Sequence, residues 1–197
     1  MEIAAPATFA LIAANVAISF YAFFVDRGFI NQFAFNVGAV TRNEQHYRVI
    51  TSAFLHADFL HLFVNMLTLF FFGPTVERIL GKLGFLVVYF GAIIASGIVS
   101  AVVNKKNPDF SAVGASGAVS GVVLSFCVFF PLAPLYILFV PFGVPAILYG
   151  VLYMAVSARL MGRAGNRIAH EGHLGGALAG VILTLLMKPE ALLRLFG

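Results

Sequence analysis

Residues 59–77, FLHLFVNMLTLFFFGPTVE, decide the fold class. This stretch is almost wholly apolar and nearly matches the roughly 20 helical residues needed to cross a hydrocarbon core of about 30 Å. Its first polar residues, His61 and Asn65, are four apart and therefore share one face of a helix. Polar side chains are costly inside lipid and indicate a functional site by default. We predict a transmembrane helix that carries part of such a site.

The composition extends this prediction to the whole chain. Hydrophobic residues make up 61% and charged residues 10%, and the mean hydropathy is +0.99, whereas a soluble domain has roughly 25% charged residues. We predict an all-α membrane protein, a single domain over residues 1–197 with six transmembrane helices. They are expected at about 5–25, 59–77, 84–103, 112–130, 135–158 and 167–187.

The ends of these runs carry further information. The first run follows Glu2 and lacks a basic region before it, so we expect it to be retained as a helix rather than removed as a signal peptide. The long loop 27–58 mixes charges with aromatic residues, which is typical of a segment lying partly in the membrane interface. Pro141 and Pro145 are expected to bend or shorten the fifth helix.

Several classes of partner are excluded. No cluster of Lys and Arg indicates nucleic acid, although the net charge is +4. The single cysteine, Cys127, provides no disulfide framework. We expect no metal and no cofactor, with membrane lipid as the surroundings.

Polar residues from three runs are expected at one depth. In a serpentine bundle the second, fourth and sixth helices enter from the same side. Asn65 lies about six residues into its run, Ser116 about four and His173 about six. At about 1.5 Å per residue, all three lie roughly 6–10 Å below one surface. Glycine stripes in the fourth run (Gly117, Gly121) and the sixth (Gly172, Gly176, Gly180) would let these helices approach closely, so that His173 can reach Ser116.

Each feature also has a plain structural explanation. Gly-xxx-Gly spacing is often simple packing, and a lone transmembrane serine is usually bonded to its own helix backbone. His170 and His173 could ligate a metal, or simply be hydrated near the surface. It is the joint placement of the residues that favours a site.

These motifs resemble those of rhomboid intramembrane serine proteases. Gly114–Gly117 is similar to their G-x-S-G, and His173 with Gly176 and Gly180 is similar to H-x-x-G-x-x-x-G. The segment His61–Asn65 is similar to H-x-x-x-N. Further similarity covers most of the chain, in Tyr47 and Arg48, in His56, and in Gly73 with Glu77.

The resemblance implies an intramembrane serine endopeptidase that cleaves transmembrane segments of other membrane proteins. Ser116 would be the nucleophile and His173 its base, as a dyad. His61, Asn65 and the Ser116 amide would stabilise the oxyanion. Gly114 would belong to the same oxyanion hole and would keep the approach to Ser116 open for the substrate backbone. The family often has tyrosine four residues after the serine, where this chain has Ser120, so the residue that packs on His173 stays open. The role of His170 is open too.

Other membrane enzymes fit less well. A zinc protease needs H-E-x-x-H, and the segment His170–His173 is one residue short. An aspartyl protease needs two buried aspartates, and Asp26, Asp58 and Asp109 are not deep in any run. A channel would need polar residues across the full depth. The leading alternative is a catalytically inactive rhomboid-like protein that binds transmembrane clients.

Orientation has two conflicting indications. More basic residues lie on the catalytic side than on the other, which by the positive-inside rule would place that side in the cytoplasm. The family resemblance implies instead a multi-pass protein of the cell membrane whose active site opens to the extracytoplasmic face. We adopt the second interpretation as the expectation.

Overall fold

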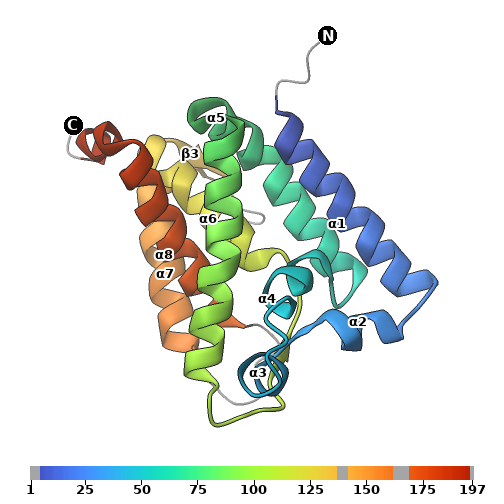
Figure 1. Ribbon diagram of the computed structural model, residues 1–197. Helices are drawn as coiled ribbons and strands as arrows, with labels where there is room; N and C mark the ends of the chain where they lie inside the picture. Colours follow the sequence, from blue (N-terminus) through green and yellow to red (C-terminus); the bar gives the residue numbers. More distant parts are fainter. Residues whose placement is uncertain (1–4, 137–141, 162–168, 196–197) are drawn as a thin grey trace.

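The computed structural model describes residues 5–136, 142–161 and 169–195. Most of them are helical, and the bundle is shown in Figure 1. In chain order the elements are α1 (Pro6–Phe24), α2 (Gly28–Phe33), β1 (Phe35–Asn36), α3 (Val37–Thr41), α4 (Arg48–Thr51), η1 (Ser52–Phe54), α5 (Phe59–Val103), β2 (Ser111–Ala112), α6 (Ser116–Phe129), β3 (Pro134–Leu135), β4 (Val144–Pro145), α7 (Ala146–Leu160), α8 (His170–Met187) and η2 (Pro189–Leu195).

The runs 59–77 and 84–103 form a single element, α5, which folds back at one glycine. Gly81 has φ 73° and ψ 166°, outside the helical region and in a range that favours glycine. Figure 1 shows the two halves of α5 running in opposite directions from this point. The predicted break between the second and third helices is therefore present, but only one residue, Gly81, leaves the helical conformation.

Two helices begin later than predicted. The fourth run was expected from residue 112, but residues 111–112 form β2, which pairs with β1, and α6 begins at Ser116. The fifth was expected from residue 135, but α7 begins at Ala146, after the short antiparallel pair β3–β4. Proline explains the second difference, because Pro134 and Pro145 face each other in that pair and cannot continue a helix.

These starts revise the predicted depths. Ser116 is the first residue of α6, and His173 lies in the first turn of α8, which begins at His170. Asn65 lies in the second turn of α5. The three residues still belong to helix starts at the same end of the bundle, the lower end in Figure 1.

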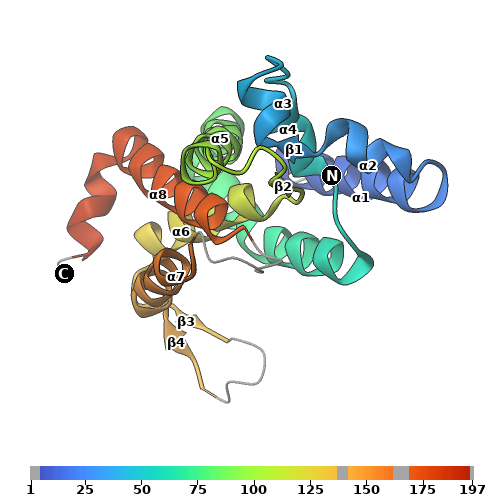
Figure 2. The same ribbon diagram turned by 90° about the horizontal axis from the view of Figure 1, so that it is seen from below.

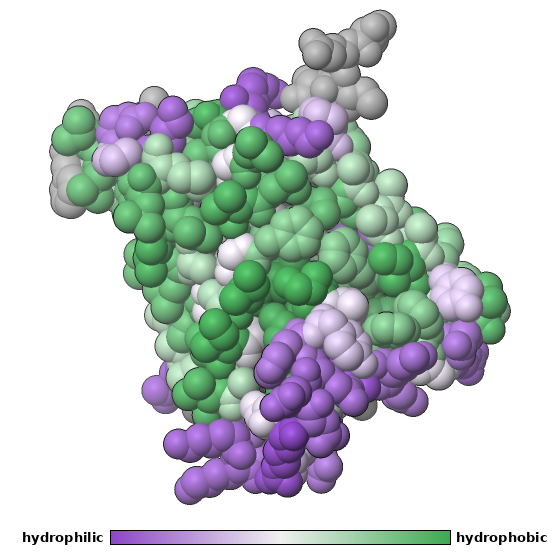
Figure 3. Space-filling view, viewed as in Figure 1, coloured by the Kyte–Doolittle hydropathy of each residue, from purple (hydrophilic) through white to green (hydrophobic). Residues whose placement is uncertain are grey.

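Among the described residues, α1 and α5 are long and apolar enough to cross a membrane. Helices α6 and α7 are apolar but shorter. On the face shown in Figure 3, a hydrophobic band separates a hydrophilic lower end from a smaller hydrophilic patch at the upper end. This surface suits a membrane protein, while the prediction of six spanning helices stays a prediction.

The long first loop is organised by one arginine. Arg48 donates from Nη1 to the carbonyl oxygens of Asn31 (3.0 Å) and Ala34 (2.9 Å), and from Nε to Gln45 (2.6 Å). Helix α2 lies against α1, whereas α3 and α4 pack against α5, as the view from below helps to show (Figure 2). The loop therefore forms an ordered unit beside the helix starts that carry the candidate site.

Glycines bring α6 and α8 into contact. A Cβ atom at Gly176 would overlap the carbonyl of Gly117, and one at Gly180 would overlap the carbonyl of Gly121. Buried Ser125 and Thr184 are also joined, by a hydrogen bond of 2.7 Å between their hydroxyls. The backbones of the two helices are therefore in direct contact at these glycines.

We expect Gly176→Ala and Gly180→Ala each to lower the free energy of unfolding by about 1–3 kcal/mol or more. The added methyl group would overlap the backbone of α6, which cannot move aside as a side chain could. Leu178→Ala, on the exposed side of the same helix, is the matched control and should change stability by no more than about 0.5 kcal/mol. Thermal unfolding can be followed by the reaction of buried Cys127 with a thiol-reactive dye. Equal melting temperatures for Gly180→Ala and Leu178→Ala would contradict this packing.

Candidate active site

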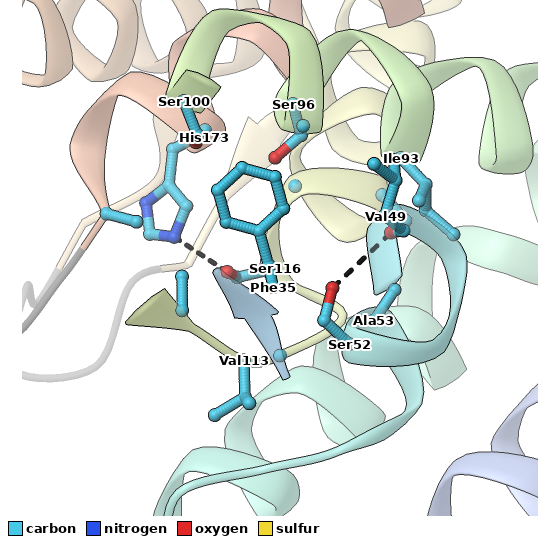
Figure 4. Close-up of a pocket in the computed structure, with 17 residues that line it drawn as sticks. Phe35, Val49, Ser52, Ala53, Ile93, Ser96, Ser100, Val113, Ser116 and His173 are labelled. Carbon is cyan, nitrogen blue, oxygen red and sulfur yellow. Dashed lines mark hydrogen bonds between the residues drawn. The ribbon is translucent and has the colours of Figure 1, made fainter. Parts of the chain in front are cut away.

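A serine and a histidine meet where α6 and α8 begin. His173 Nε2 lies 2.7 Å from Ser116 Oγ, and both side chains are partly buried (Figure 4). For the imidazole to accept the hydroxyl proton at Nε2, its own proton must be on Nδ1. Glu171, the acidic residue nearest in sequence, bonds instead to Asn104 (2.8 Å), so it does not supply a third member of a triad.

The backbone before Ser116 is shaped by glycine. Gly114 has φ +127°, and a Cβ atom there would lie 2.5 Å from Cε1 of His61. The Gly114 amide donates to the carbonyl of Ser52 (3.0 Å). Gly114 therefore makes room for His61, but its own N–H is already bonded and is not available to an oxyanion.

The start of α6 offers other donors. The first N–H groups of a helix have no partner within the helix. Among the described residues no side chain caps α6, so the amide of Ser116 remains able to bind an anion beside its own hydroxyl.

His61 and Asn65 face the same space from the start of α5. Asp58 caps this helix by accepting from the His61 amide (2.8 Å). Asn65 is 5% exposed and donates one N–H to the His61 carbonyl (2.8 Å), which leaves its second N–H for another acceptor. Both side chains line a cavity of about 990 Å³ together with Ser116 and His173.

A second, smaller pocket of about 50 Å³ also borders Ser116 (Figure 4). Its walls include three further serines, Ser52, Ser96 and Ser100, as well as His173. This volume exceeds the roughly 10–15 Å³ needed to hold one water molecule, and the hydroxyls offer it partners.

His56 holds the segment before Ser116, a role that the sequence did not reveal. The Ala115 amide donates to His56 Nε2 (3.4 Å), so His56 Nδ1 carries the proton and donates to Ser19 (2.9 Å). Ser19 in turn donates to the carbonyl of Phe54 (3.1 Å). Burial, with a smaller contribution from His61, lowers the pKa of His56 to about 3, so this ring stays neutral.

Tyr153 of α7 packs on His173, and nothing in the sequence had singled it out. The two rings are 6.3 Å apart between centroids and nearly parallel, at 16°. The Tyr153 hydroxyl is 2.5 Å from Ser120 Oγ, which itself bonds the carbonyl of Ser116 (2.7 Å). Ser120 therefore links Tyr153 to the backbone of Ser116.

No group of three or more His, Cys, Asp or Glu side chains among the described residues could hold an ion. The rings of His170 and His173 are 5.9 Å apart and meet edge to face at 74°, which is a packing contact.

A family model for the Rhomboid domain matches residues 43–190. The chain belongs to the rhomboid family. "Putative rhomboid protease YdcA" of Bacillus subtilis is 42% identical over 88 residues, covering 45% of this chain and 42% of that protein. Rhomboid protein 1, mitochondrial, of Saccharomyces cerevisiae is 37% identical over 145 residues, covering 68% of this chain and 40% of that protein. RHOMBOID-like protein 12, mitochondrial, of Arabidopsis thaliana is 29% identical over 192 residues, covering 87% of this chain and 55% of that protein.

The predicted family is thus confirmed, and the match spans Ser116, His173, His61 and Asn65. Rhomboids are membrane-embedded proteins, in agreement with the two long apolar helices. The chain covers only about half or less of the length of these relatives. The activity of this chain and its substrates are therefore proposals.

Replacing His56 by Phe should destabilise this rhomboid at pH 7, because the Ala115 amide and Ser19 lose their partner. In the wild type the folded pKa is about 3, below the ordinary value of 6.5, so the unfolded state takes up the proton first. The wild type therefore loses stability as pH falls from about 6.5 toward 3, and the Phe variant lacks this loss. The difference in melting temperature between the wild type and His56→Phe should therefore become smaller when the pH is lowered from 7.5 to 4.5. A difference that widens would contradict the assignment.

Proposed function

We propose that this protein is an intramembrane serine endopeptidase that cleaves transmembrane segments of membrane-protein substrates with a Ser116–His173 dyad. The observation that carries the proposal is the 2.7 Å hydrogen bond between Ser116 Oγ and His173 Nε2. A serine hydroxyl is a weak nucleophile at its ordinary pKa, and a base within hydrogen-bond reach activates it.

In the first half of the reaction His173 removes the Ser116 proton as the hydroxyl oxygen attacks the scissile carbonyl carbon. The protonated imidazole then delivers that proton to the leaving amine. The C–N bond breaks, and the new C–O bond leaves an acyl group on Ser116. The open side of Ser116 toward the large cavity provides the direction from which a substrate carbonyl arrives.

The negative oxygen formed during attack needs donors that are in place beforehand. The free amide of Ser116, the second N–H of Asn65 and the ring N–H of His61 are the groups proposed for this task. Gly114, predicted to belong with them, contributes by giving His61 space rather than by donating.

The second half of the reaction needs a water molecule at a site enclosed by apolar helices. The pocket of about 50 Å³ behind Ser116 suits this need, because it reaches both Ser116 and His173 and is lined by serine hydroxyls. His173 then takes a proton from this water as its oxygen attacks the acyl carbon. The C–O bond to Ser116 breaks, His173 returns the proton to Ser116 Oγ, and the carboxylic acid product leaves. The mechanism calls for no cofactor and no metal.

We place the protein in the cell membrane with six crossings. The two halves of α5 would count as two of them, because the chain reverses at Gly81. Chain direction supports an even number, since α1 begins and α8 ends at the upper end of the bundle in Figure 1. The helix starts with the dyad would then face the extracytoplasmic side.

The alternative is a non-catalytic rhomboid-like protein that binds transmembrane clients in the large cavity without cutting them. The same cavity of about 990 Å³ would serve that role. Serine reactivity separates the two functions.

Labelling of the solubilised protein by a fluorophosphonate probe tests the proposal directly. The wild type and His170→Ala should label, whereas Ser116→Ala and His173→Ala should not. Asn65→Ala should reduce the rate by about 10²–10³-fold if Asn65 is an oxyanion donor. A folded wild type that fails to label would leave the client-binding role as the better interpretation.

Substrate choice should follow from helix stability. The backbone of a transmembrane helix is bonded internally, so the scissile carbonyl becomes accessible only after local unwinding. In cells, a single-span substrate with glycine or proline near its outer end should be cleaved and should release an outer reporter extracellularly. A uniform poly-leucine helix should not be cleaved, with Ser116→Ala as the enzyme control. Equal cleavage of both helices would contradict the unwinding requirement, and a reporter released inside would contradict the orientation.

A further inference from the structure

A stack of aromatic rings on α7 ends at the proposed catalytic base. Tyr149 and Tyr153 stack with centroids 5.9 Å apart at 19°, and Tyr153 stacks on His173 at 6.3 Å and 16°. His170 meets His173 edge-on from its own helix. The imidazole of His173 is therefore held on one face by Tyr153. In the part of the chain that the structure describes, no carboxylate bonds to this imidazole.

The Tyr153 ring is itself fixed by a directed hydrogen bond. Ser120 has one hydroxyl proton, and its Oγ lies 2.7 Å from the Ser116 carbonyl, to which it donates. The Tyr153 hydroxyl, 2.5 Å from the same oxygen, must then be the donor to Ser120. A chain of two hydrogen bonds thus connects the ring that packs on the base to the backbone of the nucleophile.

Histidine needs such a constraint, because rotation about its terminal side-chain torsion is broad and poorly defined on its own. In a Ser-His-Asp triad the aspartate holds the imidazole in the correct orientation. We propose that Tyr153 is the positioning residue of His173 and performs this orienting task by stacking, with Ser120 fixing the tyrosine. The inference rests on the proposed function, since it assigns a role beside that same dyad.

The location of Tyr153 has a mechanical consequence. Helix α7 is anchored by a narrow face, on which Ala146, Gly150 and Ser157 are buried. On its other side Leu148, Val151, Leu152 and Val156 are each about half exposed. Because the orienting ring belongs to α7 rather than to α6 or α8, His173 keeps this orientation only while α7 is docked. A displacement of α7 would release the base without moving the serine.

The test compares adjacent residues on one helix. Tyr153→Ala removes the stack, and Leu152→Ala, a truncation on the exposed side of α7, is its matched control. Tyr153→Phe keeps the ring and removes only the hydroxyl, and Ser120→Ala removes the partner of that hydroxyl. Each variant is purified in detergent, checked for folding by thermal unfolding, and measured in two ways. These are the rate of fluorophosphonate labelling and the spectrum of ¹⁵N-labelled histidine rings, recorded as a function of pH.

Tyr153→Ala should label about 10- to 100-fold more slowly than the wild type, the size of effect that misplacing a reacting group produces. Leu152→Ala should stay within about twofold. Tyr153→Phe and Ser120→Ala should each lose about 2- to 10-fold, and the double variant should lose no more than one of them, because they remove the same hydrogen bond. The His173 resonances and their titration should change in Tyr153→Ala and remain as in the wild type in Leu152→Ala.

Three results would overturn the inference. One is unchanged His173 resonances in Tyr153→Ala, another is labelling of that variant as fast as Leu152→Ala, and the third is additive losses in the double variant. If Tyr153→Ala does not fold, Tyr153→Phe and Ser120→Ala test the inference instead, through the labelling rate and the histidine spectra. The histidine spectra do not depend on catalysis, so a wild type that fails to label would reject the protease function while the spectra still test the role of Tyr153.

Discussion

The contact between α6 and α8 at their glycines is the constraint on which the candidate site depends. Lipid tails are as apolar as leucine, so the hydrophobic effect does not press transmembrane helices together, and close backbone packing has to do so. Serine and histidine side chains are short. Their terminal atoms can approach to 2.7 Å only if the two backbones are already close, as the contacts at Gly176 and Gly180 require. One pattern of small residues thus provides both the cohesion of the bundle and the geometry of the dyad.

Hydrogen bonds from buried side chains also hold the helices of the bundle in place. Near the upper end of the bundle, the buried carboxylate of Glu77 accepts from the amides of Ala7 (2.9 Å) and Thr8 (2.7 Å), and so caps α1 from another helix. At the lower end, buried Glu171 accepts from Asn104 (2.8 Å) and joins the start of α8 to the end of α5. An unpaired carboxylate would be costly in this apolar interior, whereas a bonded one connects segments far apart in the chain. The helix starts at the site are therefore held at fixed relative positions.

Several site residues could be predicted from the sequence, because polar residues are rare within apolar runs and each one is conspicuous. Ser116, His173, His61 and Asn65 were identified in this way, and the structure brings all four to one cavity. Gly114 was expected in the oxyanion hole, but its amide bonds the carbonyl of Ser52, a contact that no local pattern reveals.

Other features could not be predicted, for physical reasons. Tyr153 is an aromatic residue in an aromatic-rich apolar run, so its contact with His173 leaves no trace in periodicity. The helix starts at Ser116 and Ala146 were placed too early because hydropathy does not distinguish a short apolar strand pair from the first turn of a helix. Similarly, His56 looked like part of a motif, and only the fold shows that it supports the Ala115 amide.

The position of the site at helix starts follows from the chemistry of the membrane. Inside a bilayer every backbone N–H within a helix is already bonded, so the middle of a transmembrane helix has no donor to offer a developing oxyanion. Free N–H groups exist only in the first turn, where no earlier residue accepts them. Ser116 begins α6 and offers such an amide, whereas the amide of His61 is bonded to Asp58 and that of His173 to the carbonyl of Ala169. A site that needs backbone donors must therefore lie where helices begin, and its depth in the membrane is set by how far those starts are sunk below the surface.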